Sequence, residues 1–135
     1  IQLVDRIEPL EYKKIRNHLP QVQLVQVIHV TGSEAIREAQ KISSYVDTIL
    51  LDSGNPGLAV KELGGTGRTH NWKISRQIID SLDIPVYLAG GLKPENIQEA
   101  IRAVKPFGVD LCSGVRTNDR LDSKKLLKFF SNLKQ

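Results

Sequence analysis

Residues 84–101 read IPVYLAGGLKPENIQEAI, in which an apolar strand, a pair of glycines and an amphipathic helix follow one another directly. Pro94 suits the first turn of this helix, because the N–H that proline lacks would have no helical partner there. The apolar residues of the helix recur at the spacing of one face: Ile97, Ala100, Ile101 and Val104. The stretch therefore predicts a complete βα unit with a glycine turn after its strand.

The same alternation of strand and helix extends outward from this unit in both directions. Strands are predicted at residues 1–4, 22–30, 46–52, 84–90 and 107–114. Helices are predicted at residues 9–19, 33–44, 72–82, 94–105 and 122–134. The predicted strands are apolar on both faces, which is typical of a parallel sheet covered by helices. The chain therefore predicts an α/β fold built from five βα units.

Two architectures fit this pattern, namely an open doubly wound sheet and part of a (β/α)8 TIM barrel. A whole barrel needs eight strands and about 250 residues. The 135 residues would then supply about five C-terminal βα units as a single domain, residues 1–135. Because the chain contains no Met and begins in a predicted strand, we expect further residues to precede Ile1.

The composition, with 40% hydrophobic and 25% charged residues, is that of a globular protein. The formal net charge is +4, but the basic residues are spread along the chain and only 5% of residues are aromatic, so we expect no nucleic-acid partner. No apolar run approaches the roughly 18 residues of a transmembrane helix, so no membrane partner is expected. The single cysteine, Cys112, rules out an internal disulfide framework and points to a reducing, cytoplasmic location.

Asp52 ends the predicted strand at residues 46–52. A strand interior does not readily accept a carboxylate, whereas the mouth of a barrel does. Beside apolar walls the carboxyl group would hold its proton more tightly and could serve as a general acid. Alternatively, Asp52 accepts hydrogen bonds from the backbone of the loop that follows. The sequence leaves both interpretations open.

Two glycine turns after consecutive strands could bind a phosphate. In AGGLKPEN (89–96), Gly90 and Gly91 can present bare N–H groups near the positive end of the following helix. In CSGV (112–115), Ser113 and Gly114 repeat the arrangement after the next strand. The pair matches the phosphate site that TIM barrels form after their last two strands. The alternative is two ordinary βα turns.

A third glycine-containing segment, GGTGRTH (64–70), lies in the long connection at residues 53–71. Glycines allow close approach of the backbone to an anion, and Arg68 can donate hydrogen bonds to it. It is not a Walker A motif, because the Lys-Ser/Thr pair is absent. A flexible turn would have the same composition.

Two further residues could contribute to a site. His29 lies at the carboxyl end of the strand predicted at residues 22–30, so it faces the mouth of a barrel or its rim. Cys112 is late in the last strand with no obvious base beside it, and we expect a buried structural thiol.

Four motifs in order resemble the C-terminal part of phosphoribosylanthranilate isomerases: ILLDSG (49–54), GGTGRTHNW (64–72), PVYLAGGLKPENIQEAI (85–101) and PFGVDLCSGVRT (106–117). The resemblance covers essentially the whole chain and implies strands 4 to 8 of a TIM barrel. It implies the Amadori rearrangement of N-(5-phosphoribosyl)anthranilate to 1-(2-carboxyphenylamino)-1-deoxyribulose phosphate, a step of tryptophan biosynthesis. It also implies that no metal or organic cofactor is used.

The resemblance assigns roles to individual residues. Asp52 would be the general acid, which protonates the furanose ring oxygen of the substrate. The phosphate would be bound by Gly90, Gly91, Ser113 and Gly114. A loop would close over the substrate, and it contains Gly65, Thr66, Gly67 and Arg68.

The chain also departs from the family pattern. The strand-1 motif with the cysteine base is absent, and Cys112 lies on the wrong strand to replace it. Val4 and Asp5 stand where the family commonly shows His-Gly, and Arg116 stands where many members show Glu. We therefore expect little or no isomerase activity from these 135 residues alone.

Two other functions remain open on the sequence, namely a non-catalytic phosphate-binding module and a related barrel enzyme acting on another phosphoribosyl compound. The expected partner in each case is a small phosphoribosyl molecule. An open part of a barrel exposes two sheet edges, so we also expect self-association or pairing with the missing N-terminal part.

Overall fold

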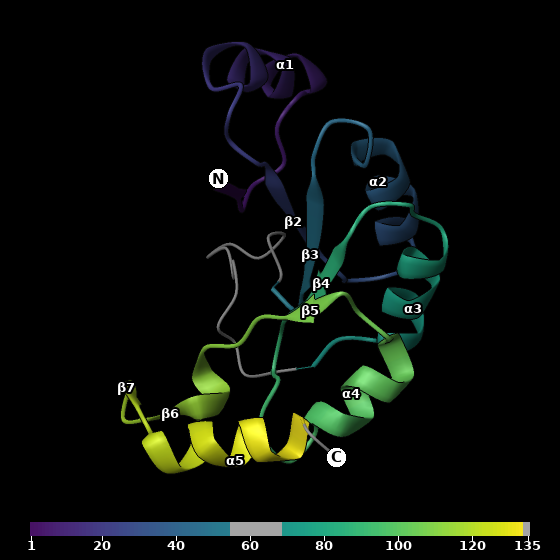
Figure 1. Ribbon diagram of the computed structural model, residues 1–135. Helices are drawn as coiled ribbons and strands as arrows, with labels where there is room; N and C mark the ends of the chain where they lie inside the picture. The colour runs from purple at the N-terminus through teal and green to yellow at the C-terminus, as the bar shows by residue number, and fades with distance from the viewer. Residues whose placement is uncertain (55–68, 134–135) are drawn as a thin grey trace.

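The computed structural model describes residues 1–54 and 69–133, and a five-stranded parallel sheet forms its centre (Figure 1). The strands are β1 (Gln2–Leu3), β2 (Val25–His29), β3 (Thr48–Asp52), β4 (Val86–Leu88) and β5 (Gly108–Val109). Their order in the sheet is the order in the chain. A doubly wound sheet reverses its strand order at a switch point, whereas consecutive parallel neighbours are what a barrel wall requires. The predicted α/β class is confirmed, and the order favours the barrel.

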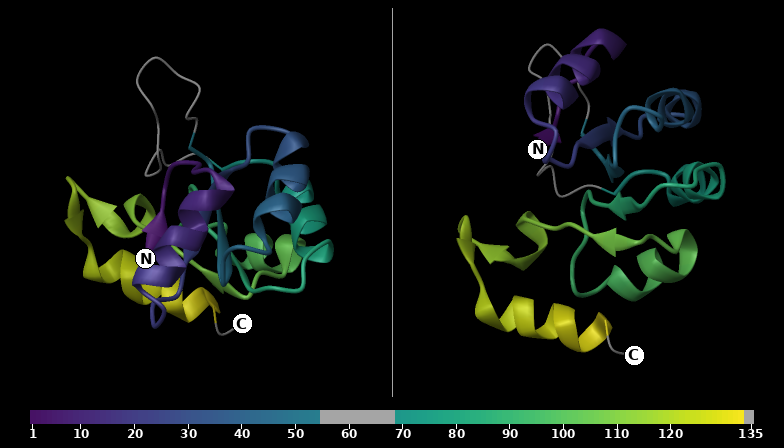
Figure 2. Two further views of the ribbon diagram at one scale, coloured as in Figure 1. Left: turned by 90° about the horizontal axis from the view of Figure 1, so that it is seen from above. Right: turned by 45° about the horizontal axis from the view of Figure 1, so that its top comes forward.

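Helices connect the strands and cover one side of the sheet, as the two views of Figure 2 show for α2, α3 and α4. They are α1 (Pro9–His18), α2 (Glu34–Ile42), α3 (Trp72–Asp80), α4 (Ile97–Val104) and α5 (Ser123–Leu133). Each lies within a predicted helix. The largest difference is that α4 begins at Ile97, because Pro94 lies in the turn that precedes the helix.

The two faces of the sheet carry different side chains. In β3, Ile49 and Leu51 are completely buried in the main core beneath the helices. Leu50 points to the other face, where it packs with Val27 and Ala89. The alternation follows from the two-residue period of a strand, so one strand supplies both the core and the inner face.

The predicted strand at residues 107–114 is wrong beyond Val109, where β5 ends. Residues Ser113–Val115 form a 3-10 helix, η1, and a short hairpin of β6 (Arg116–Thr117) and β7 (Arg120–Leu121) follows. The two hairpin-turn residues, Asn118 and Asp119, have positive φ angles of 50° and 59°. Asn and Asp tolerate this conformation better than most side chains. The chain therefore leaves the sheet early, and α5 begins only after the hairpin.

Candidate functional site

Asp52 and His29 are neighbours at the carboxyl ends of β3 and β2, where the ladder pairs them directly. The side chain of Asp52 is only 7% exposed, although it ends a strand. Its Oδ1 accepts a hydrogen bond of 2.7 Å from the backbone N–H of Ser53. The capping interaction that the sequence left open is therefore present, and the carboxyl group is also buried at the edge where parallel sheets bind ligands.

The turn after β4 lies against the turn after β3. Gly90 has a φ of +81°, and a Cβ at this position would lie 2.7 Å from the backbone N and from the Oγ of Ser53. Asn96 holds the turn from the other side. Its Oδ1 accepts from the N–H of Lys93 at 2.8 Å, and its Nδ2 donates to the carbonyl of Gly91 at 3.0 Å. The glycine pair is thus fixed next to Asp52.

The turn after β5 packs directly on the turn after β4. A Cβ on Gly114 would lie 1.8 Å from the carbonyl oxygen of Leu92, so no larger residue fits without moving one of the two turns. This close approach brings Ser113 beside Gly91. The two predicted phosphate turns therefore form one unit of structure.

Both turns open into a small hollow of about 50 Å³, together with Asp52. Its walls come from three strand ends: Asp52, Ala89, Gly90, Gly91, Leu92, Asp110, Leu111, Cys112 and Ser113. A second hollow of about 300 Å³ adjoins the same turns and is also lined by Lys93 and Lys125. Backbone N–H groups in glycine turns combined with nearby cations favour an anion. Of the predicted site residues, Asp52, Gly90, Gly91, Ser113 and Gly114 thus lie together.

Cys112 is exposed, and the prediction of a buried thiol is wrong. The physical reason is the early end of β5, which places Cys112 in the loop before η1 and on the wall of the hollow. The packing of Gly114 on Leu92, which directs the chain across the strand ends, is a long-range contact that the local sequence does not show.

Asp110 is a site residue that the sequence interpretation missed. It follows β5 directly, and its backbone N–H donates to the carbonyl of Leu88 at 2.9 Å, so the carboxylate lies at the same edge as Asp52. A signal existed, because both FGVD and TILLD end an apolar run on an Asp. The hollow therefore contains two carboxyl groups.

The other predicted site residues are less well defined. Both ring nitrogens of His29 are buried, and neither has a hydrogen-bond partner among the described residues. It lies beside Asp52 but does not line the small hollow. The predicted loop residues lie outside the described part of the chain: Gly65, Thr66, Gly67 and Arg68.

The partly buried His70 is paired with the buried Ser75 at the start of α3. The His70 Nε2 lies 2.6 Å from the hydroxyl of Ser75, which is completely buried. Burial lowers the pKa of His70 to about 4, since the protonated ring would lose its hydration. This pair does not line the hollow at the strand ends, and His70 lines a separate cavity at the start of α3.

Comparison with known proteins identifies the family of the chain. Residues 3–132 match the family model described as N-(5'phosphoribosyl)anthranilate (PRA) isomerase. The chain belongs to the phosphoribosylanthranilate isomerase family. A relative of the same name in Methanocella arvoryzae is 42% identical over 124 residues, which make up 91% of this chain and 56% of that protein.

Solved structures of the family agree with the fold. The phosphoribosyl anthranilate isomerase from Thermococcus kodakaraensis superimposes with a TM-score of 0.74 at 30% identity, over 100% of this chain and 63% of that one. A second isomerase structure, in complex with reduced 1-(o-carboxyphenylamino)-1-deoxyribulose 5-phosphate, gives a TM-score of 0.69 at 26% identity, over 94% of this chain and 55% of that one. The chain thus has the TIM-barrel type of fold of this isomerase family and spans about half the length of the relatives it matches.

Two absences concern only residues 1–54 and 69–133. No helix in these ranges is both long enough and apolar enough to cross a membrane. Nor do these ranges contain three or more His, Cys, Asp or Glu side chains arranged to hold a metal ion.

Proposed function

We propose that the chain provides the general acid and the phosphate site of an isomerase that acts on N-(5'-phosphoribosyl)anthranilate in tryptophan biosynthesis. One observation carries the proposal: a buried carboxyl group, Asp52, and two glycine turns open into the same hollow at the carboxyl edge of the sheet. A phosphoribosyl substrate needs both features, an acid at the sugar and anion donors at the phosphate. The related isomerase that was solved with a phosphate-bearing ligand supports this substrate class.

Each part of the hollow then has a chemical task. The phosphate is bound by backbone N–H groups of Gly90, Gly91 and Gly114 and by Ser113, near the cations Lys93 and Lys125. Asp52 donates a proton to the furanose ring oxygen, which opens the sugar to a Schiff base. Because Oδ1 accepts from Ser53, the second carboxyl oxygen would carry that proton. The C2′ proton then leaves to a base, which the family resemblance places on a strand outside these residues.

The same proposal extends to architecture and location. The chain would be a single domain that supplies the five C-terminal βα units of an eight-unit barrel in the cytoplasm. The exposed Val4 beside β1 and the exposed Phe107 beside β5 lie at the two sheet edges. We propose that these edges pair with the N-terminal part of the barrel or with a second copy.

The hydrogen bond between Asp52 and Ser53 favours a second candidate, a phosphate-binding module without catalysis. In that function the carboxylate only caps the turn, and the glycine turns still bind phosphate. The two candidates differ in turnover and agree in binding.

The test is turnover of phosphoribosylanthranilate, followed by loss of substrate fluorescence. We expect little activity from the chain alone and activity once the N-terminal βα units of the Methanocella relative are supplied. Asp52→Asn should lower that activity about 100-fold or more, the usual contribution of a general acid. Asp119→Asn, in the exposed hairpin turn, is the matched control and should leave it unchanged.

Equal turnover with Asp52 and with Asn at this position would refute the role of the acid. Binding of ribose 5-phosphate without turnover, even with the N-terminal units present, would support the module instead.

A further inference from the structure

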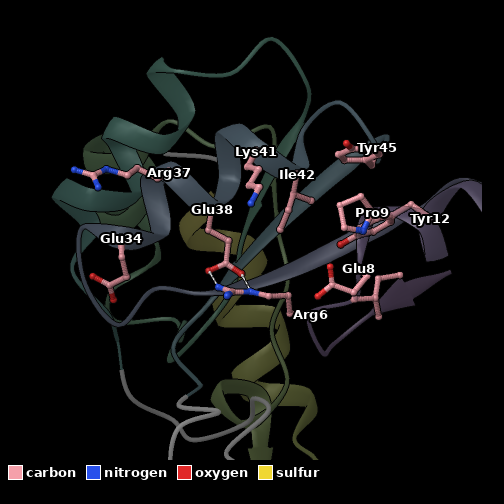
Figure 3. Close-up of a pocket in the computed structure, with 11 residues that line it drawn as sticks. Arg6, Glu8, Pro9, Tyr12, Glu34, Arg37, Glu38, Lys41, Ile42 and Tyr45 are labelled. Carbon is pink, nitrogen blue, oxygen red and sulfur yellow. Dashed lines mark hydrogen bonds and ion pairs between the residues drawn. The ribbon is translucent and has the colours of Figure 1, made fainter.

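A cavity of about 360 Å³ lies between α2 and the segment that leads from β1 into α1 (Figure 3). None of the residues that line it contributes to the hollows at the strand ends. Its volume is in the range of small-molecule sites, about 300–1,000 Å³. The cavity is therefore a separate candidate for ligand binding.

One wall of the cavity is a charged face of α2. Four of its residues recur at intervals of three and four and hence lie on one side of the helix: Glu34, Arg37, Glu38 and Lys41. Three of the four, Glu34, Arg37 and Lys41, are exposed, as is usual for the polar face of a helix, so their charges are accessible to a ligand that enters from solvent.

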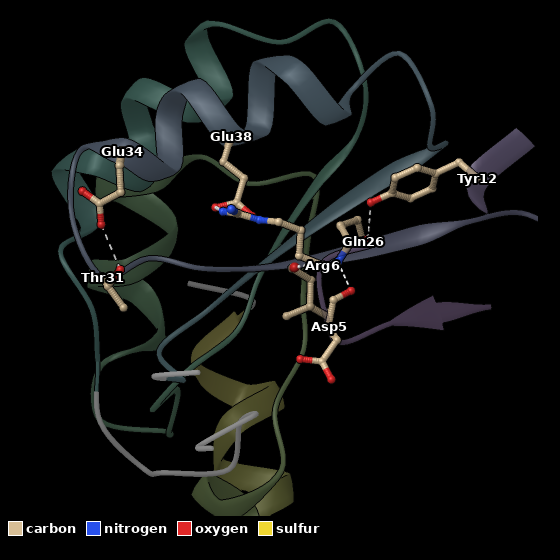
Figure 4. Close-up of polar contacts among 8 residues, drawn as sticks. Asp5, Arg6, Tyr12, Gln26, Thr31, Glu34 and Glu38 are labelled. Atoms are coloured by element: carbon tan, nitrogen blue, oxygen red, sulfur yellow. Dashed lines mark hydrogen bonds and ion pairs between the residues drawn. The ribbon is translucent and has the colours of Figure 1, made fainter. Parts of the chain in front are cut away.

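The opposite wall is held in place by hydrogen bonds to Gln26 (Figure 4). The hydroxyl of Tyr12 donates to Oε1 of the buried Gln26 at 2.6 Å. Gln26 Nε2 in turn donates to the carbonyls of Leu3 and Asp5, at 3.0 and 3.1 Å. The ring of Tyr12 also stacks on Tyr45, with centroids 5.5 Å apart. These contacts form the cavity before any ligand enters it.

An ion pair spans the two walls. Arg6 donates from Nε to Glu38 at 2.9 Å, and a second nitrogen of the guanidinium lies 2.6 Å from the same carboxylate. Glu34 accepts a hydrogen bond from the hydroxyl of Thr31 at 2.9 Å. These charged groups therefore have partners within the protein.

Three other charged side chains line the cavity, and none of them makes a hydrogen bond or ion pair with a described residue: Lys41 and Arg37 on α2, and Glu8 on the opposite wall. The guanidinium of Arg37 points away from Lys41 (Figure 3). Glu8 acts on Arg6 only through space, where it adds to the larger effect of Glu38 in raising the pKa of that guanidinium.

Between Lys41 and Glu8 lie apolar side chains, with Ile42 beside Lys41 and Pro9 beside Glu8 (Figure 3). A cation and an anion on opposite walls, separated by an apolar surface, are complementary to a zwitterion that carries an apolar group.

We propose that this cavity binds a free α-amino acid with an apolar side chain. The carboxylate of the ligand pairs with Lys41, its ammonium group pairs with Glu8, and its side chain packs on Ile42 and Pro9. The site is independent of the proposed isomerase function, because no residue is shared between the two.

Calorimetric titration of the 135-residue chain tests the proposal, with L-phenylalanine, L-leucine and L-valine as probes. At least one should bind saturably. For L-phenylalanine, the matched analogues are phenethylamine, which lacks the carboxylate, and 3-phenylpropanoate, which lacks the ammonium group. Each should bind about tenfold or more weakly, because each loses one charge-assisted contact.

Two variants test which charge of the protein contacts which charge of the ligand. The Lys41→Gln variant should bind L-phenylalanine about tenfold more weakly, with an affinity close to that of the unmodified chain for phenethylamine. The Glu8→Gln variant should also bind it about tenfold more weakly, with an affinity close to that of the unmodified chain for 3-phenylpropanoate. Both side chains are exposed, so the melting temperature should change little. Lys124→Gln on α5 is the control and should bind like the unmodified chain. Absence of binding by all three amino acids, or binding that neither variant weakens, would overturn the proposal.

Discussion

The two faces of the sheet differ in the size of the apolar cluster that each one buries. The face beneath the helices contains the large core, in which Leu51 and Leu88 are completely buried. The buried cluster that the described residues form on the inner face is small, with Leu50, Val27 and Ala89 at its centre. The helix-covered face therefore provides most of the stability. The carboxyl edge of the same strands is then free to hold Asp52 and the glycine turns.

Leu51 and Leu50 allow the stability of the two faces to be measured directly, because they are adjacent in β3 and have the same side chain. Leu51→Ala should lower the free energy of unfolding by about 4 kcal/mol, since it leaves a cavity in the main core. Leu50→Ala should cost only about 2 kcal/mol, because its cluster is small and the surroundings can adjust. Urea denaturation of both variants measures the difference. Equal losses would mean that the inner face contributes as much stability as the outer one.

His70, at the start of α3, should make the stability of the helix-covered side depend on pH. Its folded pKa of about 4 lies below the ordinary value of 6.5, so the folded chain favours the neutral ring. The stabilisation is complete above pH 6.5 and is lost as the pH falls toward 4, by up to about 3 kcal/mol. In the His70→Gln variant, the glutamine side chain can still form a hydrogen bond with Ser75, but it does not titrate. The difference in stability between the two proteins should change over this pH range, and a constant difference would contradict the assignment.

Gly114 is the residue at which the two glycine turns pack most closely. Gly114→Ala should lower stability by about 2 kcal/mol and weaken phosphate binding, because the new Cβ would collide with the carbonyl of Leu92. Gly32→Ala is the matched control. There the atoms nearest to a Cβ would be those of the carboxylate of Glu34, which can rotate away. Thermal melting and phosphate titration of both variants should separate them, and the idea of tightly packed turns fails if they behave alike.

Much of the fold was predictable because it depends on local patterns. The apolar run before Asp52 and the helical spacing after Asn71 each correspond to an observed element, β3 and α3. The end of β5 was not predictable, because it depends on the contact between Gly114 and Leu92, which are far apart in sequence. The hairpin that follows was signalled by Asn118 and Asp119, a pair suited to positive φ, but the pattern of βα units hid it.

In the candidate site, too, the features that depend on local patterns were predictable and those that depend on long-range contacts were not. The positions of Asp52, Gly90 and Gly91 followed from where strands end, because parallel strands share one carboxyl edge. The exposure of Cys112 did not follow, because it depends on the path of the chain after β5. Whether Asp52 caps a turn or faces a ligand could not be decided from residue type, and the structure shows the cap and the hollow together.

The two glycine turns are proposed to form one phosphate site beside Asp52. Titration of the ¹⁵N-labelled chain with inorganic phosphate, followed by two-dimensional NMR, is the direct test. The amide signals of Gly90, Gly91, Ser113 and Gly114 should shift together and saturate with one dissociation constant. Shifts that spare these four amides, or that occur at only one of the two turns, would show that the turns do not form a shared phosphate site.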